Sequence, residues 1–393
     1  YYYTPLVVGL AVFLAIVPPL LTPERNFSRW IDIALTFLVV SCPCALVISV
    51  PLSFFAGIGA SSRLGILVKG SNYLEALAQT KKAVFDKTGT LTKGVFSVVE
   101  VISEGMEEKE ILRLAMLAEQ HSGHPIALSV KEAYRQRYDI YTDYDKHRIE
   151  NLKQIPGRGI SISIDEREVL LGNAGLMEEF NIEYKSHAHE ATLLYMAVDL
   201  KYVACIVISD IIKDDAKQAI NELKSMGISD IIMLTGDRKE VAEAVSGELG
   251  ISEVYSSLLP GDKLAKVEEL LEKDNNPKHK LVFVGDGIND APVLARADIG
   301  IAMGGLGSDA AIEAADVVIM NDEPSKIAMA IRLAKRTLGI ATQNIIFALL
   351  VKVVVLTFTA FGMVNMWAAV FADVGVTLLA IANAMRNLNI KKV

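Results

Sequence analysis

The sequence contains only three cysteines among its 393 residues, namely Cys42, Cys44 and Cys205. Two of them lie in one long apolar segment and the third in a short strand-like run, a pattern that implies no disulfide framework. Aromatic residues make up 7% of the chain, its formal net charge is -8, and no basic cluster alternates with aromatic residues. The composition therefore argues against a disulfide-stapled fold and predicts no nucleic-acid partner.

Apolar residues make up 52% of the sequence and are concentrated at its two ends. About 20 of them are needed to cross the hydrocarbon core of a bilayer as a helix. Four segments meet that length and are predicted to span a membrane: residues 4–21, 31–51, 340–361 and 366–384. The alternative, a buried core helix, explains one such segment better than it explains two closely spaced hairpins.

Basic residues flank the outer ends of both predicted hairpins, whereas the linkers within them are short. The positive-inside rule then predicts that the lipid bilayer is a partner and that the middle of the chain is cytoplasmic. The flanking residues are Arg63, Lys69, Lys81, Lys82, Lys335, Arg336, Arg386, Lys391 and Lys392.

The middle of the chain alternates apolar strand-like runs with amphipathic helices such as residues 215–227 and 239–249. This alternation predicts a parallel β-sheet with helices on both faces, and the carboxyl ends of its strands are where ligands bind. Residues 98–205 interrupt the pattern after its first strand and are more charged, which indicates an inserted domain. The strands are expected at residues 83–85, 206–209, 231–235, 281–285, 299–302 and 317–320.

Residues 86–92 read Asp-Lys-Thr-Gly-Thr-Leu-Thr directly after the apolar run 83–85. A carboxylate at the end of a strand suits a nucleophile that attacks a phosphate, because Gly89 permits close backbone approach while Lys87 and the turn's N–H groups offset negative charge. Asp and Gly after a strand more often form an ordinary turn. The full heptad, however, resembles the phosphorylation signature of P-type ATPases, ion pumps that form an aspartyl-phosphate.

This resemblance implies a haloacid-dehalogenase-like Rossmannoid phosphorylation domain with an inserted α+β nucleotide-binding domain, beside α-helical membrane spans. The predicted divisions are membrane helices 1–70, phosphorylation domain 71–97 and 206–338, nucleotide-binding domain 98–205, and a membrane hairpin 339–393. Hydrolases of the haloacid dehalogenase superfamily carry a second Asp, a general acid, two residues after the nucleophile. Because Thr88 occupies that position, we expect the acyl-phosphate of Asp86 to hydrolyse slowly.

Three further motifs follow in the order that the P-type family shows. Thr235-Gly236-Asp237 follows a predicted strand, where a hydroxyl and glycine N–H groups hold phosphate oxygens. Lys263 resembles the phosphate-neutralising lysine of the family, although Gly261 stands where the family often has Glu. Each short motif on its own is an ordinary turn.

The third motif, residues 285–290, reads Gly-Asp-Gly-Ile-Asn-Asp. The resemblance assigns Asp286 to Mg²⁺, together with Asp86 and the backbone carbonyl of Thr88. It gives Asn289 and Asp290 a supporting role. An oxygen-only set with few protein ligands is how Mg²⁺ is held beside a transferring phosphoryl group.

In the insertion, Glu119, the pair His124-Pro125 and the run Gly157-Arg158-Gly159 resemble the nucleotide-binding residues of heavy-metal P-type ATPases. The resemblance implies that Glu119 and His124 contact the adenine of ATP and that Gly157 and Gly159 allow close backbone approach. Four other histidines have no comparable pattern and are expected to lie on the surface: His121, His147, His187 and His189.

Cys42-Pro43-Cys44 lies in the second predicted span. Cysteines two residues apart on an intact helix point about 200° from each other, but Pro43 lacks an N–H and clashes with the carbonyl of Val39, so it breaks the helix and turns both thiols toward one point. The alternative is a pair of buried small cysteines beside a kink. Cys-Pro-Cys resembles the signature of heavy-metal P-type ATPases.

Lys352 and Asp373 are charged residues inside the last two predicted spans. Each costs about 2.5–3.5 kcal/mol in a membrane if unpaired, so both are expected to face the interior of the bundle, although Lys352 has snorkelling as an alternative. With Cys42 and Cys44 they would balance a divalent ion, and sulfur with oxygen suits Zn²⁺, Cd²⁺ or Pb²⁺, whereas Cu⁺ prefers sulfur alone. The pattern resembles the zinc, cadmium and lead branch.

The sequence also lacks Thr-Gly-Glu, the actuator-domain loop of such pumps, and begins at Tyr1 without a charged leader. We expect the chain to be a truncated form of such a pump that lacks the actuator and amino-terminal regions. It is also expected to lie in the plasma (inner) membrane. It is then expected to bind nucleotide but not to run a full cycle. Three rival functions remain: a Cu⁺ pump, a membrane-anchored phosphatase of the haloacid dehalogenase type, and a non-catalytic fragment that sequesters metal at Cys42 and Cys44.

Overall fold

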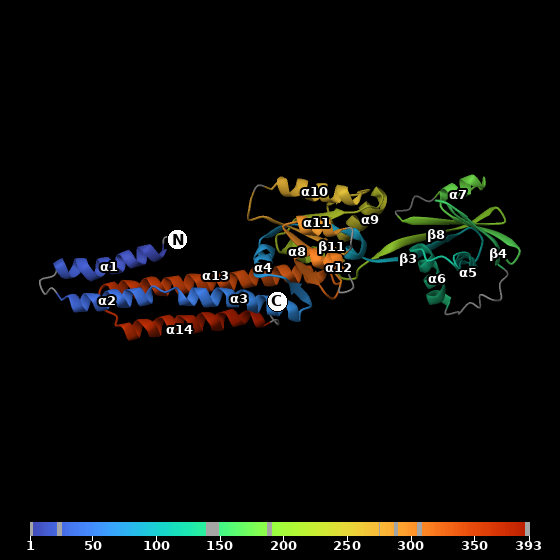
Figure 1. Ribbon diagram of the computed structural model, residues 1–393. Helices are drawn as coiled ribbons and strands as arrows, with labels where there is room; N and C mark the ends of the chain where they lie inside the picture. Colours follow the sequence, from blue (N-terminus) through green and yellow to red (C-terminus); the bar gives the residue numbers. More distant parts are fainter. Residues whose placement is uncertain are drawn as a thin grey trace.

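The computed structural model describes residues 3–21, 26–138, 149–186, 191–274, 276–286, 290–304 and 309–389. Its described elements form three regions in a row: a group of long helices, a seven-stranded sheet flanked by helices, and a six-stranded sheet with helices of its own (Figure 1). Both the first and the last helices of the chain belong to the first region. The middle region is therefore joined to the long helices at both ends of its sequence.

Four helical segments in the described chain are long and apolar enough to cross a membrane. Many of their large apolar side chains are exposed, including Leu21, Phe55 and Phe371, as expected for surfaces that face lipid. The helices of this region are α1 (Tyr3–Leu21), α2 (Phe27–Val40), α3 (Cys44–Arg63), α13 (Ser325–Ala360), α14 (Met366–Ala384) and the short η4 (Met385–Leu388). The four predicted spans are thus found, with different bounds for two of them.

The second predicted span, residues 31–51, is broken at Cys-Pro-Cys as predicted, and the two helices that meet there extend beyond its predicted bounds. Helix α2 ends at Val40 and α3 begins at Cys44, so the 37-residue candidate span is broken near its middle. Pro43 explains the break, since it has no N–H to continue the hydrogen-bond ladder. The third span is longer than predicted, because α13 begins at Ser325 in the core of the middle region.

The seven-stranded sheet has the order β1-β13-β12-β11-β2-β9-β10 and is parallel except for β1, which pairs antiparallel with β13. Five of the six predicted strands are confirmed in it, and the two short edge strands β1 and β10 were not predicted. The strands are β1 (Ile66–Val68), β2 (Thr80–Asp86), β9 (Asp230–Leu234), β10 (Glu253–Tyr255), β11 (Lys280–Gly285), β12 (Ile299–Met303) and β13 (Val317–Ile319).

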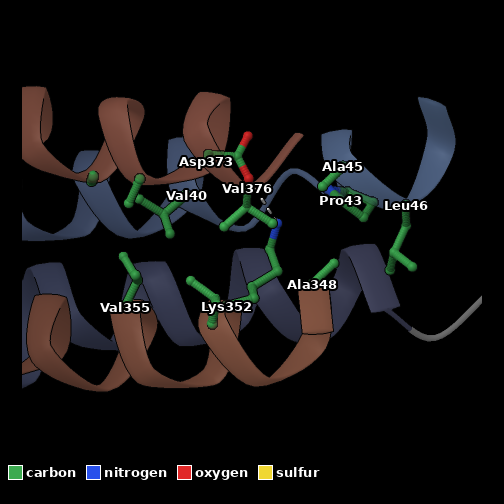
Figure 2. A pocket seen from close by; sticks show the side chains of 12 residues that line it. Val40, Pro43, Ala45, Leu46, Ala348, Lys352, Val355, Asp373 and Val376 are labelled. Carbon is green, nitrogen blue, oxygen red and sulfur yellow. Dashed lines mark ion pairs between the residues drawn. The ribbon is translucent and has the colours of Figure 1, made fainter. Parts of the chain in front are cut away.

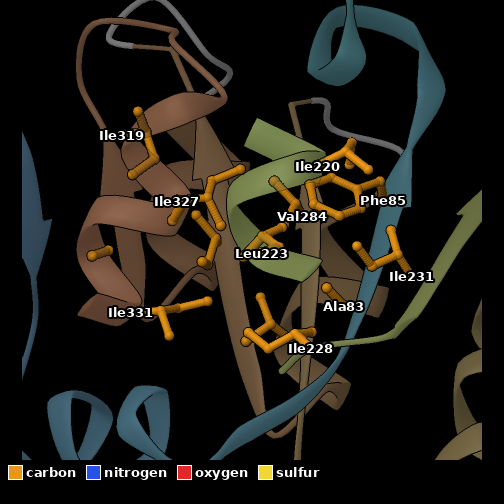
Figure 3. Packing of buried hydrophobic residues seen from close by; sticks show 14 of the residues in the cluster. Ala83, Phe85, Ile220, Leu223, Ile228, Ile231, Val284, Ile319, Ile327 and Ile331 are labelled. Atoms are coloured by element: carbon orange, nitrogen blue, oxygen red, sulfur yellow. The ribbon is translucent and has the colours of Figure 1, made fainter. Parts of the chain in front are cut away.

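Helices cover both faces of this sheet and bury its apolar residues. On one face, Ile220 and Leu223 of α8 and Ile327 of α13 pack against strand residues such as Phe85 and Val284 (Figure 3). On the other, Val267 and Leu294 pack against Val84 and Phe283. The helices around the sheet are α4 (Ser71–Ala78), α8 (Ala216–Ser225), α9 (Lys239–Leu249), α10 (Pro260–Glu272), α11 (Ala291–Arg296) and α12 (Asp309–Ala314), besides the start of α13.

The insertion forms the six-stranded sheet β3-β8-β7-β6-β5-β4, which is antiparallel throughout. Its elements are β3 (Thr92–Ser103), α5 (Glu108–Ala118), α6 (Pro125–Tyr138), β4 (Ile149–Ile155), β5 (Gly159–Ile164), β6 (Arg167–Gly172), α7 (Ala174–Glu179), β7 (Thr192–Val198) and β8 (Lys201–Ile212). Its first and last strands in sequence, β3 and β8, extend beyond the predicted limits of 98 and 205.

The strand predicted at residues 206–209 lies in this antiparallel sheet, so its assignment to the parallel sheet was wrong. Residues 204–208 of β8 are fully buried between β3 and β7. A short, continuously apolar run is typical of parallel strands, but a strand buried on both faces of an antiparallel sheet has the same pattern. Sequence alone does not separate these cases.

Candidate phosphoryl-transfer and ion sites

Asp86 is the last residue of β2, a central strand that lies between β11 and β9. Its neighbour across the β2–β9 pair is Leu234, the residue that precedes the Thr235-Gly236-Asp237 motif. Only 5% of Asp86 is exposed. Parallel pairing therefore brings two of the predicted motifs together at the carboxyl edge of the sheet, as expected for this class of fold.

Lys263 and two further carboxylates surround Asp86. The Lys263 ammonium, on α10, pairs with Oδ1 of Asp86 and lies 3.1 Å from Oδ1 of Asp290. Oxygens of Asp86, Asp286 and Asp290 all lie within 4.8 Å of one another. The structure thus joins four of the predicted site residues, while the fifth from this region, Asn289, lies outside the described residues.

The electrostatics of these carboxylates favour a cation. Burial, and after it the charge of Asp290, raise the pKa of Asp86, Lys263 opposes both, and the net pKa is about 7. Burial likewise raises the pKa of Asp286 to about 6, with Asp290 adding to the effect. Burial alone would lower the pKa of Lys263, but the two carboxylates beside it raise that pKa above its ordinary value. Two buried carboxylates and one half-buried carboxylate, with one ammonium, retain unbalanced negative charge, which fits a divalent cation such as Mg²⁺.

Gly89 is required by the turn that follows Asp86. Its φ is +71°, and a Cβ at this position would lie 1.5 Å from Oδ2 of Asp286. The turn is also held by Lys213, whose buried ammonium donates to the Gly89 carbonyl at 2.7 Å and pairs with Asp322 at 2.8 Å. Sequence reasoning missed Lys213, since a lysine 124 positions from Gly89 gives no local signal.

Lys87 is turned toward two carboxylates of the protein. Its ammonium pairs with Asp237 and lies 3.6 Å from Oδ2 of Asp210, and its side chain is 5% exposed. Asp210 also accepts a hydrogen bond from the Thr92 hydroxyl. Lys87 therefore links the nucleophile loop to the Asp237 motif, and its charge is largely balanced before any phosphate arrives. Asp210 was not predicted as a site residue.

The Thr235-Gly236-Asp237 motif forms a compact turn at the end of β9. The Asp237 backbone N–H donates to Oγ1 of Thr235 at 3.1 Å, and Thr235 is 1% exposed. A Cβ on Gly236 would lie 3.3 Å from the Leu258 carbonyl, so the adjoining backbone approaches closely. Thr88, in contrast, is exposed at the surface of the nucleophile loop.

A cleft of about 1310 Å³ connects this edge of the sheet to the insertion. It is lined by Lys87, Gly236 and Asp237 at one end and by all four predicted nucleotide residues, Glu119, His124, Gly157 and Gly159. The exposed His121, predicted as a surface residue, lines the same cleft, whereas His147, His187 and His189 lie outside the described residues.

Two of the nucleotide residues also have local structural roles, and a third borders open space. His124 accepts a hydrogen bond through Nδ1 from the N–H of Ile126 at 3.3 Å, at the start of α6. A Cβ on Gly159 would lie 2.3 Å from the Leu171 carbonyl, so this glycine permits the close β5–β6 contact. Gly157 has φ +72° and nothing within 4 Å of an added Cβ, which leaves space for a ligand at the cleft surface.

In the membrane region, the break between α2 and α3 brings the two thiols together, as predicted. Sγ of Cys42 and Sγ of Cys44 lie 2.6 Å apart. Lys352 donates from its ammonium to the Cys42 carbonyl and lies 3.9 Å from Oδ1 of Asp373. Figure 2 shows Lys352 and Asp373 pointing toward each other from α13 and α14 across a cavity next to Pro43. Lys352 thus faces the bundle interior.

The predicted ligands of the transported ion lie in the same part of the membrane region, but their ligand atoms do not converge on one point. Among the described residues, the one group of three such ligand atoms within 4.8 Å is Asp86, Asp286 and Asp290. Cys42, Cys44 and Asp373 do not meet that distance. The Lys352 ammonium contacts both the Cys42 carbonyl and Asp373.

Known proteins resemble this chain over most of its length. Residues 80–298 match the haloacid dehalogenase-like hydrolase family. The chain is 57% identical over 391 residues to a cadmium, zinc and cobalt-transporting ATPase of Bacillus subtilis (strain 168), covering 99% of this chain and 55% of that protein. It is 49% identical over 386 residues to a zinc-transporting ATPase of Synechocystis sp., covering 98% of this chain and 52% of that protein.

A crystal structure of a zinc-transporting PIB-type ATPase in the E2.Pi state superimposes with a TM-score of 0.86 at 36% identity, covering 98% of this chain and 62% of that one. The chain spans about half the length of the curated relatives it matches. The chain belongs to the haloacid dehalogenase-like hydrolases and, within them, corresponds to one part of a P-type ATPase of the heavy-metal branch.

Proposed function

We propose that this chain is the nucleotide-binding, phosphorylation and ion-binding part of an ATP-driven exporter of a divalent soft metal ion. The observation that carries the proposal is the buried Asp86, which lies beside Lys263 and two carboxylates. Its neighbour in sequence, Lys87, lines the same cleft as Glu119 and His124. This arrangement suits delivery of the terminal phosphoryl group of ATP to a carboxylate.

In the proposed step, a carboxylate oxygen of Asp86 forms a bond to the γ-phosphorus of ATP. The bond between that phosphorus and the β–γ bridging oxygen breaks, and ADP leaves with the electron pair. Lys263 offsets the negative charge of the incoming phosphoryl group, and the Thr235 hydroxyl and Gly236 N–H hold its oxygens. The tied nucleophile loop, held by Lys213 at Gly89, keeps Asp86 oriented.

Asp86, Asp286 and the Thr88 carbonyl would hold Mg²⁺, with Asp290 in support. The fit rests on the three carboxylates within 4.8 Å and on the burial that raises the pKa of Asp86 and Asp286. When bound, Mg²⁺ supplies positive charge against the phosphate oxygens. Thr88 provides no general acid beside the nucleophile, so the acyl-phosphate persists while an ion moves.

The proposed cargo is Zn²⁺, Cd²⁺ or Pb²⁺. Two thiolates from Cys42 and Cys44 and one carboxylate from Asp373 carry three negative charges, which a divalent ion and the Lys352 ammonium balance. Sulfur with oxygen suits these ions better than Cu⁺. The relatives named as cadmium- and zinc-transporting ATPases support the same choice.

Lys352 is proposed to act as a built-in replacement for the ion. Its ammonium lies 3.9 Å from Oδ1 of Asp373, so it is placed to pair with that carboxylate when the cation leaves. Pairing would favour release and discourage rebinding. If Lys352→Ala left metal-stimulated turnover and release of the complete pump unchanged, this role would be abandoned.

The membrane spans make the chain an integral membrane protein. We further propose the plasma (inner) membrane as its location, with the sheet regions in the cytoplasm, on the basis of the basic residues that flank the outer ends of the hairpins. The proposed partners are an actuator domain and amino-terminal regions, which fits the coverage of about half of each relative. Without them the chain is expected to be phosphorylated but not to turn over steadily.

The test is radiolabelling of the full chain with γ-labelled ATP in the presence of Zn²⁺, Cd²⁺, Pb²⁺ or Cu⁺. We expect an acid-stable, hydroxylamine-sensitive label that divalent ions stimulate, that Asp86→Asn abolishes, and that loses its metal dependence in Asp373→Ala. Asp230→Asn is the matched control, because this exposed carboxylate lies on the adjacent strand at the opposite edge of the sheet.

Three other outcomes would contradict the proposal. Stimulation by Cu⁺ but not Zn²⁺ would indicate a Cu⁺ pump. Rapid release of phosphate from small phosphoesters without any effect of metal would indicate a phosphatase. Metal binding with no phosphoenzyme under any condition would indicate a fragment that only sequesters metal.

A further inference from the structure

Asn344 is an amide buried among the membrane helices, and the proposed phosphoryl-transfer and ion-binding chemistry does not use it. It lies on α13 inside the third predicted span and is 2% exposed. A buried amide in a membrane helix is costly unless its donors and acceptors are bonded within the protein. The partners of Asn344 therefore indicate its role.

Asn344 connects three helices. Its side-chain nitrogen donates to the Ala380 carbonyl on α14 at 3.0 Å and to Oγ of Ser53 on α3 at 3.4 Å. Its oxygen accepts from Nδ2 of Asn383 at 2.9 Å. Asn387, just after α14, donates to the Ser53 carbonyl at 3.1 Å. Ser53, Asn344, Asn383 and Asn387 form one network, here called the Asn344 cluster.

The Asn344 cluster continues the helix faces that line the ion cavity. On α13, the cavity residues Ala348 and Val351 follow Asn344 by four and seven positions. On α14, Ala380 follows Asp373 by seven positions. Residues at these spacings share one face of a helix, and seven residues rise about 10 Å. The cluster therefore fixes the relative height of the helices two turns from the ion site.

The cavity itself offers few other polar contacts between helices. Among the described residues that line it, Lys352 and Asp373 are charged and the others are apolar. Lys352 contacts the Cys42 carbonyl and Asp373, and ion binding by Asp373 would remove the second of these contacts. The relative heights of the helices must then be held by contacts that involve none of the ion ligands. The hydrogen bonds of the Asn344 cluster meet that requirement.

We infer that Asn344 is a positioning residue for the membrane ion site, an inference that rests on the proposed function. By fixing the heights of α3, α13 and α14, it lets Cys42, Cys44 and Asp373 present their ligand atoms to one divalent ion. It touches neither the ion nor its ligands.

The test uses the full chain in lipid nanodiscs with Co²⁺ as the probe, because d–d absorption reports the coordination geometry of Co²⁺ and charge-transfer absorption reports bound thiolate. Asn344→Leu removes the amide at similar volume, and Ser53→Ala removes one of its partners. Thr342→Ala is the matched control, since this exposed neighbour lies on the same helix and its hydroxyl donates to the Leu338 carbonyl of that helix at 2.8 Å. Thermal stability is measured for every variant.

We expect Asn344→Leu to bind Co²⁺ at least about 10-fold more weakly, or about 1.4 kcal/mol, with a changed d–d spectrum for each ion bound. Ser53→Ala should shift the spectrum in the same direction, and Thr342→Ala should match the parent. An unchanged spectrum and affinity in Asn344→Leu would overturn the inference even if thermal stability fell. If that variant does not fold, Ser53→Ala decides by the same criterion.

Failure of the proposed function has a different signature. If the parent chain binds Co²⁺ without thiolate charge transfer, or Zn²⁺ does not displace the Co²⁺, the ion site itself is absent and the inference falls with it. If the parent shows both properties and the cluster variants match it, the ion site stands and only the role of Asn344 is rejected.

Discussion

Replacing Gly89 by alanine is expected to misplace a candidate Mg²⁺ ligand while leaving the nucleotide residues untouched. The added Cβ would lie 1.5 Å from Oδ2 of Asp286, whereas ordinary contact lies at 3.4–4 Å, so the carboxylate must move by about 2 Å. A displacement of about 1 Å near reacting groups costs on the order of 100-fold in rate. We therefore expect phosphoenzyme formation to slow by at least about 100-fold.

The same substitution also strains the backbone, since φ of Gly89 is +71° and a left-handed conformation costs an L-residue about 1–2 kcal/mol. Gly227→Ala separates the two effects, because Gly227 has φ +80° and nothing within 4 Å of an added Cβ.

Rapid-quench labelling with γ-labelled ATP measures the rate, thermal denaturation measures stability, and a fluorescent ATP analogue measures nucleotide affinity. Gly227→Ala should lose stability and keep its rate, and both variants should bind nucleotide like the parent. Equal phosphorylation rates in the two variants would refute the argument from Asp286.

Thr88→Asp restores the acid position of related hydrolases, so the phosphorylated Asp86 should lose phosphate about 10²–10⁴-fold faster in a chase with unlabelled ATP; an unchanged rate would show that Thr88 does not protect the intermediate. Lys213→Met leaves the Gly89 carbonyl without its buried donor, which costs about 1–3 kcal/mol and should lower both thermal stability and phosphorylation rate. Burial raises the pKa of Cys205 from 9.0 to about 12, so its contribution to stability is present below about pH 9 and is lost as the pH rises toward 12. At pH 9, iodoacetamide should modify Cys205 only on unfolding, and mass spectrometry showing modification of the folded chain would contradict this.

Much of the catalytic edge was predictable because its signals are local. The run from Asp86 to Thr92, the turn after β9 and the break at Pro43 each depend on residues adjacent in sequence, and parallel pairing then brings the first two together. Their positions follow from general rules for strand ends and for proline in helices.

The unpredicted features depend on contacts between distant residues. Lys213 reaches Gly89 across 124 positions, and Asn344 reaches Ser53 across 291. Residues 206–209 are apolar because they are buried on both faces, and that pattern is the same in an antiparallel and a parallel sheet. The continuation of α13 into the middle region was missed because its first turns are amphipathic rather than uniformly apolar.

The X-ray absorption spectrum of Zn²⁺ bound to the full chain tests most directly whether two thiolates and a carboxylate hold one divalent ion. We predict two sulfur neighbours at about 2.3 Å and oxygen at about 2.0–2.2 Å. The sulfur signal should fall in Cys42→Ser, and the oxygen signal should change in Asp373→Ala. A spectrum with oxygen and nitrogen neighbours alone, or one that neither substitution alters, would contradict the proposed ion site.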